Sequence, residues 1–203
     1  MQDPIEECSI FLDAGYLSKI SEYFAGEGYY LKYPIEQFPH TLAKIKGLWC
    51  KDTYYYTAPP HQSPDPTLEE RERRRRHNDF IDNILKKKYN WIVKEGRCQK
   101  VDEFKQKGVD NLVDIDLMDL CYKKIVKKVI VLVCDTDFVP ILNKIRSEYG
   151  IHVILAYFTD RKRHSEFSMS NHLLTACDDT IMIEEKHFNA IGKKPKFKFR
   201  NPI

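Results

Sequence analysis

The chain has 203 residues, of which 42% are hydrophobic and 31% are charged, and its formal net charge is +3. This length and composition are typical of one folded domain and exclude a chain that is disordered throughout. A net charge so close to zero also excludes a protein whose whole surface is basic, so any contact with a polyanion has to be local.

The first third of the chain predicts two strands and a helix. Ser9–Leu12 is a short apolar run that ends at Asp13, which is typical of a buried strand, and Tyr16–Phe24 follows as a helix that Gly26 closes. Thr53–Tyr56 is aromatic and β-prone, and it runs into a proline-rich segment that must be a loop.

The middle third predicts a long helix followed by a polar arm. Thr67 and Glu70 have the spacing of a capping box, from which we expect a helix that runs to about Lys88. The apolar spacing near its end predicts that the helix buries Phe80, Ile81, Ile84 and Leu85. Trp91–Val93 is expected as a strand and Lys94–Lys107 as an extended arm or hairpin.

From Asp110 onward, helices and buried strands alternate. Val129–Cys134 consists of six apolar residues, a pattern typical of a strand that is covered on both faces and pairs in parallel. The alternation predicts an α/β fold with a mainly parallel central sheet flanked by helices. The expected helices are Asp110–Lys124, Val139–Tyr149 and Ser170–Ala176, and the further strands are Val153–Phe158 and Thr180–Ile183.

We expect one domain over residues 1–185 and a basic tail over residues 186–203. Such a tail either touches phosphates or is simply solvated. Its basic residues are Lys186, Lys193, Lys194, Lys196, Lys198 and Arg200.

Two further patterns have both a structural and a nucleic-acid interpretation. The run Arg73–Arg76 suggests contact with RNA, but Glu69, Glu70 and Glu72 each precede an arginine by four residues, which favours a solvated, self-paired helix. The tyrosines of Tyr54–Tyr56 either stack on unpaired bases or, in a strand, pack alternately inward, and we favour inward packing for Tyr55 or for its two neighbours.

The cysteines and the apolar segments bear on the compartment. None of the cysteines forms a CxxC pair or a zinc-type cluster, so we expect free thiols in a reducing, cytoplasmic environment. No apolar run is long enough to cross a membrane, and the acidic N-terminus is unlike a signal peptide. The cysteines are Cys8, Cys50, Cys98, Cys121, Cys134 and Cys177.

Aspartates follow two of the predicted strands and begin a predicted helix. Asp13 follows the first strand, Asp135 and Asp137 follow the most apolar strand, and Asp110 begins a helix. If the two strands are neighbours, these carboxylates meet at the carboxyl edge of the sheet, where ligands bind in such folds. Carboxylates that meet repel one another, and a divalent cation removes that penalty. Oxygen ligands alone suit Mg²⁺ or Mn²⁺. The alternative is that each aspartate is only a turn residue or a helix cap.

Three segments that contain these acids resemble the acidic motifs of NYN domains, on the LabA-like side of the PIN-like nuclease superfamily. They are Phe11–Leu17, Lys107–Asp110 and Cys134–Pro140. The resemblance extends from Ser9 to Ile183, where Ser170–Leu173 and Asp178 resemble the closing helix and strand of the family. It implies a PIN-like three-layer fold and cleavage of RNA, with single-stranded RNA as the expected partner and Mg²⁺ or Mn²⁺ as cofactor. The implied metal ligands and catalytic residues are Asp13, Asp110, Asp135 and Asp137.

A second tier of site residues stays open between two acids. Asp116 matches a further acidic position of the family, whereas helix geometry places Asp114 on the face of Asp110. Tyr16, Lys107 and Thr136 are expected to contact substrate, although Lys107 is equally well explained as an exposed lysine. Two positions depart from the family: Tyr16 stands where many members have Asn, and Cys134 where a small Ser is more common.

The sequence therefore predicts a metal-dependent endoribonuclease. The alternative is a catalytically silent module of the same fold that binds RNA or regulates, and a homodimer is left open. A third interpretation, the Asp-x-Asp metal motif of nucleotide-sugar glycosyltransferases, leaves Asp13 and Asp110 without a role.

Overall fold

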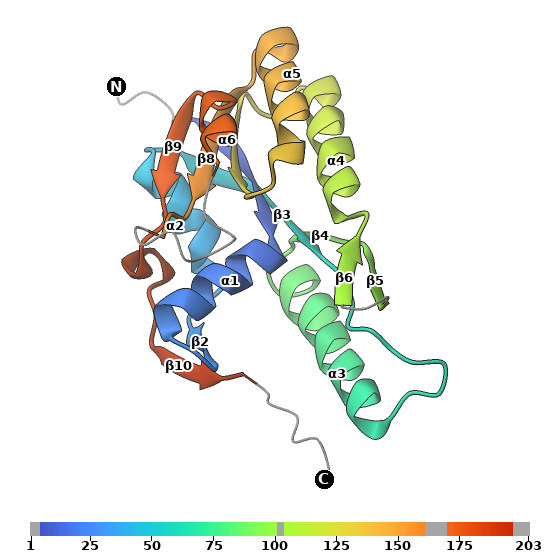
Figure 1. Cartoon of the computed structure of the whole chain (residues 1–203). Coiled ribbons are helices and arrows are strands. Elements are labelled where there is room, and N and C mark those ends of the chain that lie inside the picture. The colour runs from blue at the N-terminus through green and yellow to red at the C-terminus, as the bar shows by residue number, and fades with distance from the viewer. Residues whose placement is uncertain (1–4, 101–103, 161–169, 197–203) are drawn as a thin grey trace.

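A six-stranded parallel sheet forms the centre of the protein in a computed structural model that describes residues 5–100, 104–160 and 170–196 (Figure 1). Its strand order is β4-β3-β1-β7-β8-β9, and every neighbouring pair is parallel. This arrangement confirms the predicted α/β class. The strands are β1 (Glu7–Asp13), β3 (Trp49–Thr57), β4 (Ile92–Glu95), β7 (Lys128–Leu132), β8 (His152–Tyr157) and β9 (Asp179–Met182).

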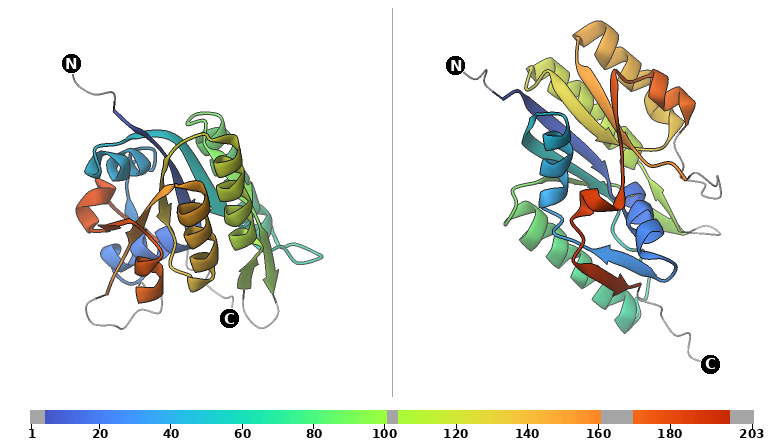
Figure 2. Two further views of the ribbon diagram at one scale, coloured as in Figure 1. Left: turned by 90° about the horizontal axis from the view of Figure 1, so that it is seen from above. Right: turned by 90° about the vertical axis from the view of Figure 1, so that its left-hand side faces the viewer.

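Helices cover both faces of this sheet, so the fold has three layers (Figure 2). One layer holds α1 (Ala14–Ala25), α2 (Gln37–Ile45) and the π-helix η1 (Phe80–Lys86), which continues α3 (Leu68–Asp79). The opposite layer holds α4 (Val109–Lys123), α5 (Val139–Tyr149) and α6 (Asn171–Thr175). The described residues also form two short 3-10 helices, η2 (Thr136–Phe138) and η3 (Glu185–Phe188).

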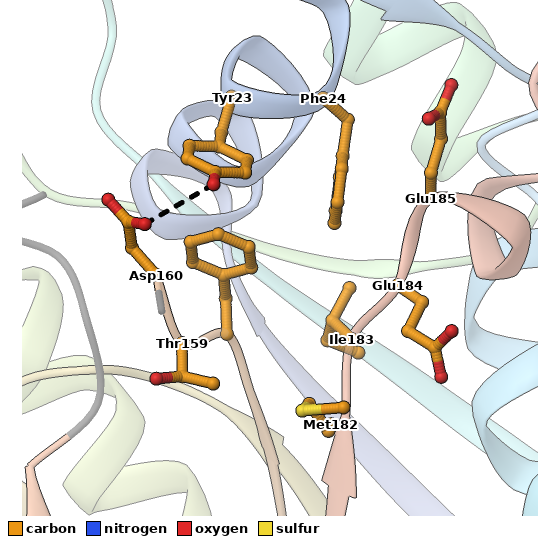
Figure 3. Close-up of a pocket in the computed structure, with 9 residues that line it drawn as sticks. Tyr23, Phe24, Thr159, Asp160, Met182, Ile183, Glu184 and Glu185 are labelled. Carbon is orange, nitrogen blue, oxygen red and sulfur yellow. Dashed lines mark hydrogen bonds between the residues drawn. The ribbon is translucent and has the colours of Figure 1, made fainter. Parts of the chain in front are cut away.

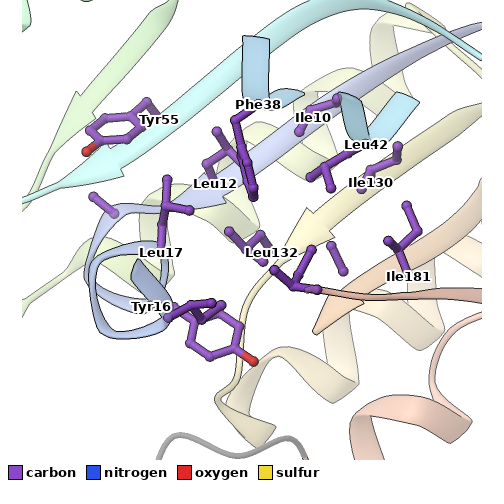
Figure 4. Close-up of a cluster of buried hydrophobic side chains, with 14 of the residues drawn as sticks. Ile10, Leu12, Tyr16, Leu17, Phe38, Leu42, Tyr55, Ile130, Leu132 and Ile181 are labelled. Atoms are coloured by element: carbon purple, nitrogen blue, oxygen red, sulfur yellow. The ribbon is translucent and has the colours of Figure 1, made fainter. Parts of the chain in front are cut away.

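Successive residues of the central strands enter two separate cores. Ile10 and Leu12 of β1 pack beneath α1 and α2, as the close-up in Figure 4 shows, whereas Phe11 faces α4. The three tyrosines of β3 divide in the same way, since Tyr55 joins the first core and its two neighbours join the second. The ring of Phe11 stacks on Tyr54 at 4.5 Å. We expected either Tyr55 or its two neighbours to pack inward, but the structure buries all three, because both faces of the sheet are covered. A sheet buried on both faces also explains why its strands are so apolar.

Two small sheets lie outside the central one. β2 (Tyr29–Lys32) pairs antiparallel with β10 (Gly192–Pro195), and β5 (Arg97–Lys100) pairs antiparallel with β6 (Phe104–Lys107). The second pair is the hairpin expected for the polar arm. The first includes part of the expected basic tail, whose described portion reaches residue 196 and also contains η3 with the buried Phe188.

Several element boundaries differ from the predicted ones. The capping box of Thr67 and Glu70 is present, but the α-helix ends at Asp79 and continues as η1, which buries Ile81 and Leu85. α2 and β2 were not predicted from the sequence. Phe38 and Leu42 lie four residues apart, and both are buried in α2. So short an amphipathic pattern does not predict a helix by itself, because most of the stability of a short helix comes from tertiary packing.

The arginine-rich α3 buries none of its residues. Glu72 pairs with Arg76 at 2.7 Å, as predicted, and also with Arg75 at 2.8 Å. Glu70 instead serves the helix start, where its carboxylate accepts the backbone N–H of Thr67. The charges of this helix therefore stabilise it locally.

All six cysteines are free thiols. Among the described helices, none is both long enough and apolar enough to span a lipid bilayer.

Candidate metal centre

The carboxyl edge of the central sheet brings the predicted acidic segments together. β1 lies between β3 and β7, and Leu12 of β1 is level with Leu132 of β7. Asp13 is the last residue of β1, and Asp135 follows the end of β7 by three residues. The two aspartates therefore leave neighbouring parallel strands at the same edge, which was the condition set by the sequence.

Asp13 is held by the helix that follows it. Its Oδ1 accepts the backbone N–H groups of Gly15 at 2.7 Å and Tyr16 at 3.3 Å, so the residue caps α1. Capping fixes the carboxylate at the sheet edge, and Oδ2 takes no part in these two bonds.

Asp135 and Asp137 belong to the turn that follows β7. Asp135 caps η2, and its Oδ1 accepts the backbone N–H of Asp137 at 3.0 Å. Both aspartates and the intervening Thr136 are exposed, while Phe138 is buried and anchors the turn. This short anchored turn presents its acidic side chains to solvent.

α4 contributes acids on two different faces. The helix begins at Val109 rather than at the predicted Asp110, because Gly108 takes the cap position with a φ of 77°, a left-handed conformation that favours glycine. Asp110 therefore lies in the first turn, and Asp114 follows it one turn later on the same face.

Asp116 faces a different part of the structure. It is 7% exposed, and its carboxylate accepts the hydroxyl of Tyr56 at 2.9 Å and pairs with Lys94 at 3.3 Å. These contacts tie α4 to β3 and β4. The geometry thus gives Asp116 a structural partner on the sheet and leaves Asp114 beside Asp110.

The acids at this edge influence one another's ionisation. Burial raises the pKa of Asp13, against the lowering effect of its two backbone N–H bonds, and the charge of Asp110 raises it further. The pKa of Asp110 is raised by burial and by the charges of Asp135 and Asp137. Burial and the charge of Asp110 raise the pKa of Asp114. Such mutual repulsion requires the carboxylates to lie near one another.

The pKa of the Cys134 thiol also reflects the nearby aspartates. Its pKa is raised to about 11, first by burial and then by the charges of Asp13, Asp135 and Asp110. The thiol is therefore protonated at neutral pH. Three carboxylates that come from three different elements all act on this one side chain.

The donor set fits a hard divalent cation, although the side chains are not gathered into a finished cage. Over residues 5–100, 104–160 and 170–196, no three His, Cys, Asp or Glu side chains stand close enough to hold one ion as they are oriented. Asp114, however, has a buried Oδ1 with no hydrogen-bond partner among the described groups. An unpartnered buried carboxylate oxygen is unfavourable, and a cation placed beside Asp110 would satisfy it.

The three residues expected to contact substrate differ in their surroundings. Tyr16 is 1% exposed, and its hydroxyl oxygen accepts the backbone N–H of Phe158 at 2.8 Å. Thr136 is exposed between two of the aspartates. Lys107 is the last residue of β6, and its side chain lies outside the described part of the structure.

Lys19 is a residue of the site that the sequence did not indicate. It is exposed on α1. The pKa values of Asp13 and Cys134 are both raised overall, and the positive charge of Lys19 opposes that rise. A lysine about one and a half turns beyond a strand-end aspartate has no sequence signature, because helices commonly carry lysines on their solvent face.

Comparison with known proteins gives a family and a fold. A family model described as the NYN domain matches residues 10–184. The crystal structure of a protein of unknown function from Vibrio parahaemolyticus is similar with a TM-score of 0.56 and 16% sequence identity, over 93% of this chain and 98% of that one. At that identity the similarity concerns the fold alone. The curated proteins include no match.

Proposed function

Because this chain belongs to the NYN domain family, a family of PIN-like nucleases, we propose that it is a metal-dependent endoribonuclease that hydrolyses phosphodiester bonds of single-stranded RNA. The membership confirms the resemblance seen in the three acidic segments. The proposed metal ligands are Asp13, Asp110, Asp135 and Asp137, with Asp114 as a further ligand and Mg²⁺ or Mn²⁺ as the ion.

One observation supports this proposal above the others. Acids from β1, α4 and the turn after β7 lie at one sheet edge, where Asp110 raises the pKa of Asp13, and Asp135 and Asp137 raise the pKa of Asp110. Within the described part of the chain, none of these five aspartates forms an ion pair with a lysine, arginine or histidine. A fold that holds so many carboxylates at one edge without a direct ion pair is suited to a cation that is not part of the polypeptide.

In this proposal the aspartates bind the metal ion and lysine contacts the substrate phosphate. A divalent ion bound by these aspartates would supply positive charge to a scissile phosphate and would lower the pKa of a water molecule. Asp13 and Asp135 are fixed by their backbone N–H bonds, so each presents a carboxylate of defined position. Lys19, exposed on α1, is the proposed contact for a substrate phosphate, and positioning and charge neutralisation supply the rate gain.

The decisive assay compares the wild type with Asp135→Asn on labelled single-stranded RNA in the presence of Mn²⁺. Asparagine still accepts the backbone N–H of Asp137, so the turn is retained while the negative charge is removed. Loss of an outer-shell partner already costs about 10–100-fold, so loss of this ligand is expected to slow cleavage at least about 100-fold. Asp65→Asn, at an exposed loop position, is the matched control.

Equal cleavage by the wild type and the Asp135→Asn variant would defeat the proposal. The second candidate is a catalytically silent RNA-binding module. It is favoured by the finding that, among the described residues, no three His, Cys, Asp or Glu side chains are close enough to bind one metal ion. That candidate predicts RNA binding without Mn²⁺-dependent turnover, and no effect of Asp135→Asn on binding.

A further inference from the structure

The small antiparallel sheet of β2 and β10 lies beside α1 and presents one face to solvent (Figure 1). β2 is fixed to the helix because the backbone N–H of Leu31 donates to Ser21 Oγ at 3.0 Å. Leu31 is 1% exposed and belongs to the core beneath α1. Successive residues of a strand point to opposite faces, so Tyr30 and Lys32 point away from that core.

The two neighbouring lysines of β10 have different surroundings. Lys193 is paired with Leu31 across the sheet, and its Nζ donates to the backbone carbonyl of Ala25 at 2.6 Å. A cation is favourable there because the last carbonyl groups of a helix carry partial negative charge, so Lys193 fixes β10 to the end of α1. Lys194 is paired with Tyr30, shares its outward face and is exposed.

Lys196, just beyond β10, joins this face to α1. Its Nζ lies 5.2 Å from the centre of the Tyr30 ring and forms an ion pair with Glu22 of the helix. These contacts bring Glu22, Lys196 and Tyr30 side by side. Because Glu22 already neutralises Lys196, the part of Lys196 is to position the half-buried ring of Tyr30.

The remaining lysines of the face are accessible to a ligand. Lys32 and Lys194 are both exposed, and within the ranges that the structure describes neither forms an ion pair. Gly192 stands opposite Lys32, and a Cβ at that position would meet nothing within 4 Å. The space beside Lys32 is therefore open.

α1 connects this face with the candidate metal centre. Asp13 caps the start of the helix, and Lys19 and Glu22 lie three residues apart, which places them on the same side. Lys19 is exposed and, among the described residues, has no ion pair. A helix of 12 residues is about 18 Å long, so the lysines follow one another over that distance from the aspartates to the small sheet.

Aromatic rings hold the C-terminal half of α1 against the central sheet. Tyr23 and Phe24 line a pocket of about 450 Å³ together with the segments that follow β8 and β9 (Figure 3). Their ring centroids lie 4.6 Å and 5.5 Å from that of Phe158. These contacts fix the helix, so Lys19 and the small sheet keep a constant separation.

We propose that Lys19, Tyr30, Lys32 and Lys194 form a track that binds single-stranded RNA and leads it away from the metal centre. The inference rests on the proposed nuclease function and names the route of its substrate. Lysine ammonium groups donate to phosphate oxygens without regard to base sequence. A tyrosine ring beside them stacks on an unpaired base, which a duplex does not offer.

An acidic segment of a protein is the competing occupant, because it also matches the lysines. RNA is favoured over it by two observations. The track contains an aromatic ring next to its lysines, and it begins at the aspartates that would hold the scissile phosphate. An oligoglutamate peptide is therefore included as a probe below.

Fluorescence anisotropy of the full chain in EDTA tests binding independently of metal and cleavage. The probe is a labelled oligouridylate of about 16 nucleotides, at the upper end of the site sizes of single-strand binders. We expect the double variant Lys32→Gln/Lys194→Gln to bind about tenfold more weakly. The slope of log affinity against log salt should become shallower by about 1.4, or about 0.7 for each lost phosphate contact.

The matched control removes the same charge at the amino edge of the central sheet. Lys44→Gln/Lys127→Gln changes two exposed lysines that form no ion pair among the described residues. Its RNA affinity is expected to stay within about twofold of wild type. An equal loss in both double variants would show that only the net charge matters and would overturn the track.

Substitution of Tyr30 tests the preference for a single strand. The wild type is expected to bind the single strand about tenfold more tightly than a duplex of the same length. Tyr30→Leu should lose that preference, whereas Tyr30→Phe keeps the ring and should retain it. Tyr122→Leu, at a tyrosine of α4 that is 83% exposed, is the control expected to change nothing.

Cleavage with Mn²⁺ tests the same track in function. The wild type should have a lower KM for an RNA of about 16 nucleotides than for one of about 4, because only the longer strand reaches the small sheet. In Lys32→Gln/Lys194→Gln the advantage of the longer RNA should disappear through KM, with kcat unchanged.

The outcomes separate the track from the nuclease proposal. RNA binding in EDTA that depends on Lys32 and Lys194, in a protein that cuts no RNA, retains the track and removes the nuclease. Cleavage that depends on Asp135, with unchanged RNA affinity in the lysine double variant, does the reverse. Binding of oligoglutamate as tight as that of RNA of similar charge overturns the track and assigns the face to an acidic protein partner.

Discussion

Acidic residues at the two edges of the central sheet differ in whether they form ion pairs. At the amino edge, each of four acids has a cationic partner within 2.8 Å. The pairs are Glu6 with Lys128, Glu7 with Lys51, Asp179 with Lys46 and Asp178 with Arg146. At the carboxyl edge, Asp13, Asp110 and Asp114 instead have raised pKa values.

This difference separates acids that serve the fold from acids that serve a ligand. Paired acids at the amino edge hold strand starts and helix ends together, and the pKa values of Asp178 and Asp179 are lowered accordingly. Acids whose pKa is raised in the fold weaken it when they ionise, so their presence at one edge is best explained by function. The contrast is open to direct measurement.

The largest expected effect concerns binding of Mn²⁺ to the carboxyl edge. Asp110→Asn removes a proposed ligand without removing a cap, and we expect Mn²⁺ affinity to fall about 100-fold. Calorimetry or electron paramagnetic resonance measures this directly. Glu7→Gln, an acid of the amino edge, is the matched control. Unchanged affinity in the Asp110 variant would erase the distinction between the two edges.

The next effect concerns Asp116, a paired acid on the same helix as the unpaired ones. Asp116→Asn breaks the contact with Lys94 and weakens the bond from the hydroxyl of Tyr56. We expect unfolding to become easier by about 2 kcal/mol. Mn²⁺ affinity should stay within about twofold of wild type. Chemical denaturation and metal titration of one preparation measure both quantities, and loss of metal binding at equal stability would move Asp116 into the metal centre.

A smaller effect is expected at Asp178 of the amino edge. Burial raises the pKa of this carboxyl, but the bonds from Arg146 and from the backbone N–H of Val153 outweigh burial and lower it overall. Its contribution is therefore present above the unfolded pKa, near 4, and is lost as the pH falls through the lower folded value. Asp178→Asn should cost about 1 kcal/mol at pH 7 and less at pH 3. Denaturation at both pH values tests this, and an equal cost at both would contradict it.

The smallest effect has the opposite sign. Asp114→Asn removes a carboxyl group whose pKa is raised by burial and by the charge of Asp110. The free energy of unfolding of the metal-free protein should therefore rise by up to about 1 kcal/mol at pH 7. Added Mn²⁺ should stabilise the wild type more than this variant. Thermal unfolding with and without the ion gives both comparisons, and a destabilised metal-free variant would show that Asp114 serves the fold.

The sequence predicted the fold better than it predicted the details of the site. Apolar runs such as Val129–Cys134 determine the buried parallel strands, and the order of the acidic segments identifies the family. The sequence set only a condition for the site, that the strands before Asp13 and Asp135 are neighbours, and the strand order meets that condition. These features depend on local composition and on the general rule for open α/β sheets.

Other features depend on contacts that no local pattern records. The partner of Asp116 is Tyr56, sixty positions away in the chain, so sequence spacing gives no means of choosing between Asp114 and Asp116. The burial of Tyr16 against Phe158 likewise follows only from the placement of β8 beside β7. The pocket beside Tyr23 joins three separate segments and has no motif of its own.

The central position of β1 also has a consequence for synthesis on the ribosome. β1 is the first strand of the sheet to be made, and its partner β3 follows soon after it. Its other partner, β7, emerges much later, and at about 5–20 residues per second several seconds separate the two. During that interval one side of an apolar strand has no native partner, so the nascent chain should be a client of ribosome-associated chaperones until Lys128–Leu132 arrives.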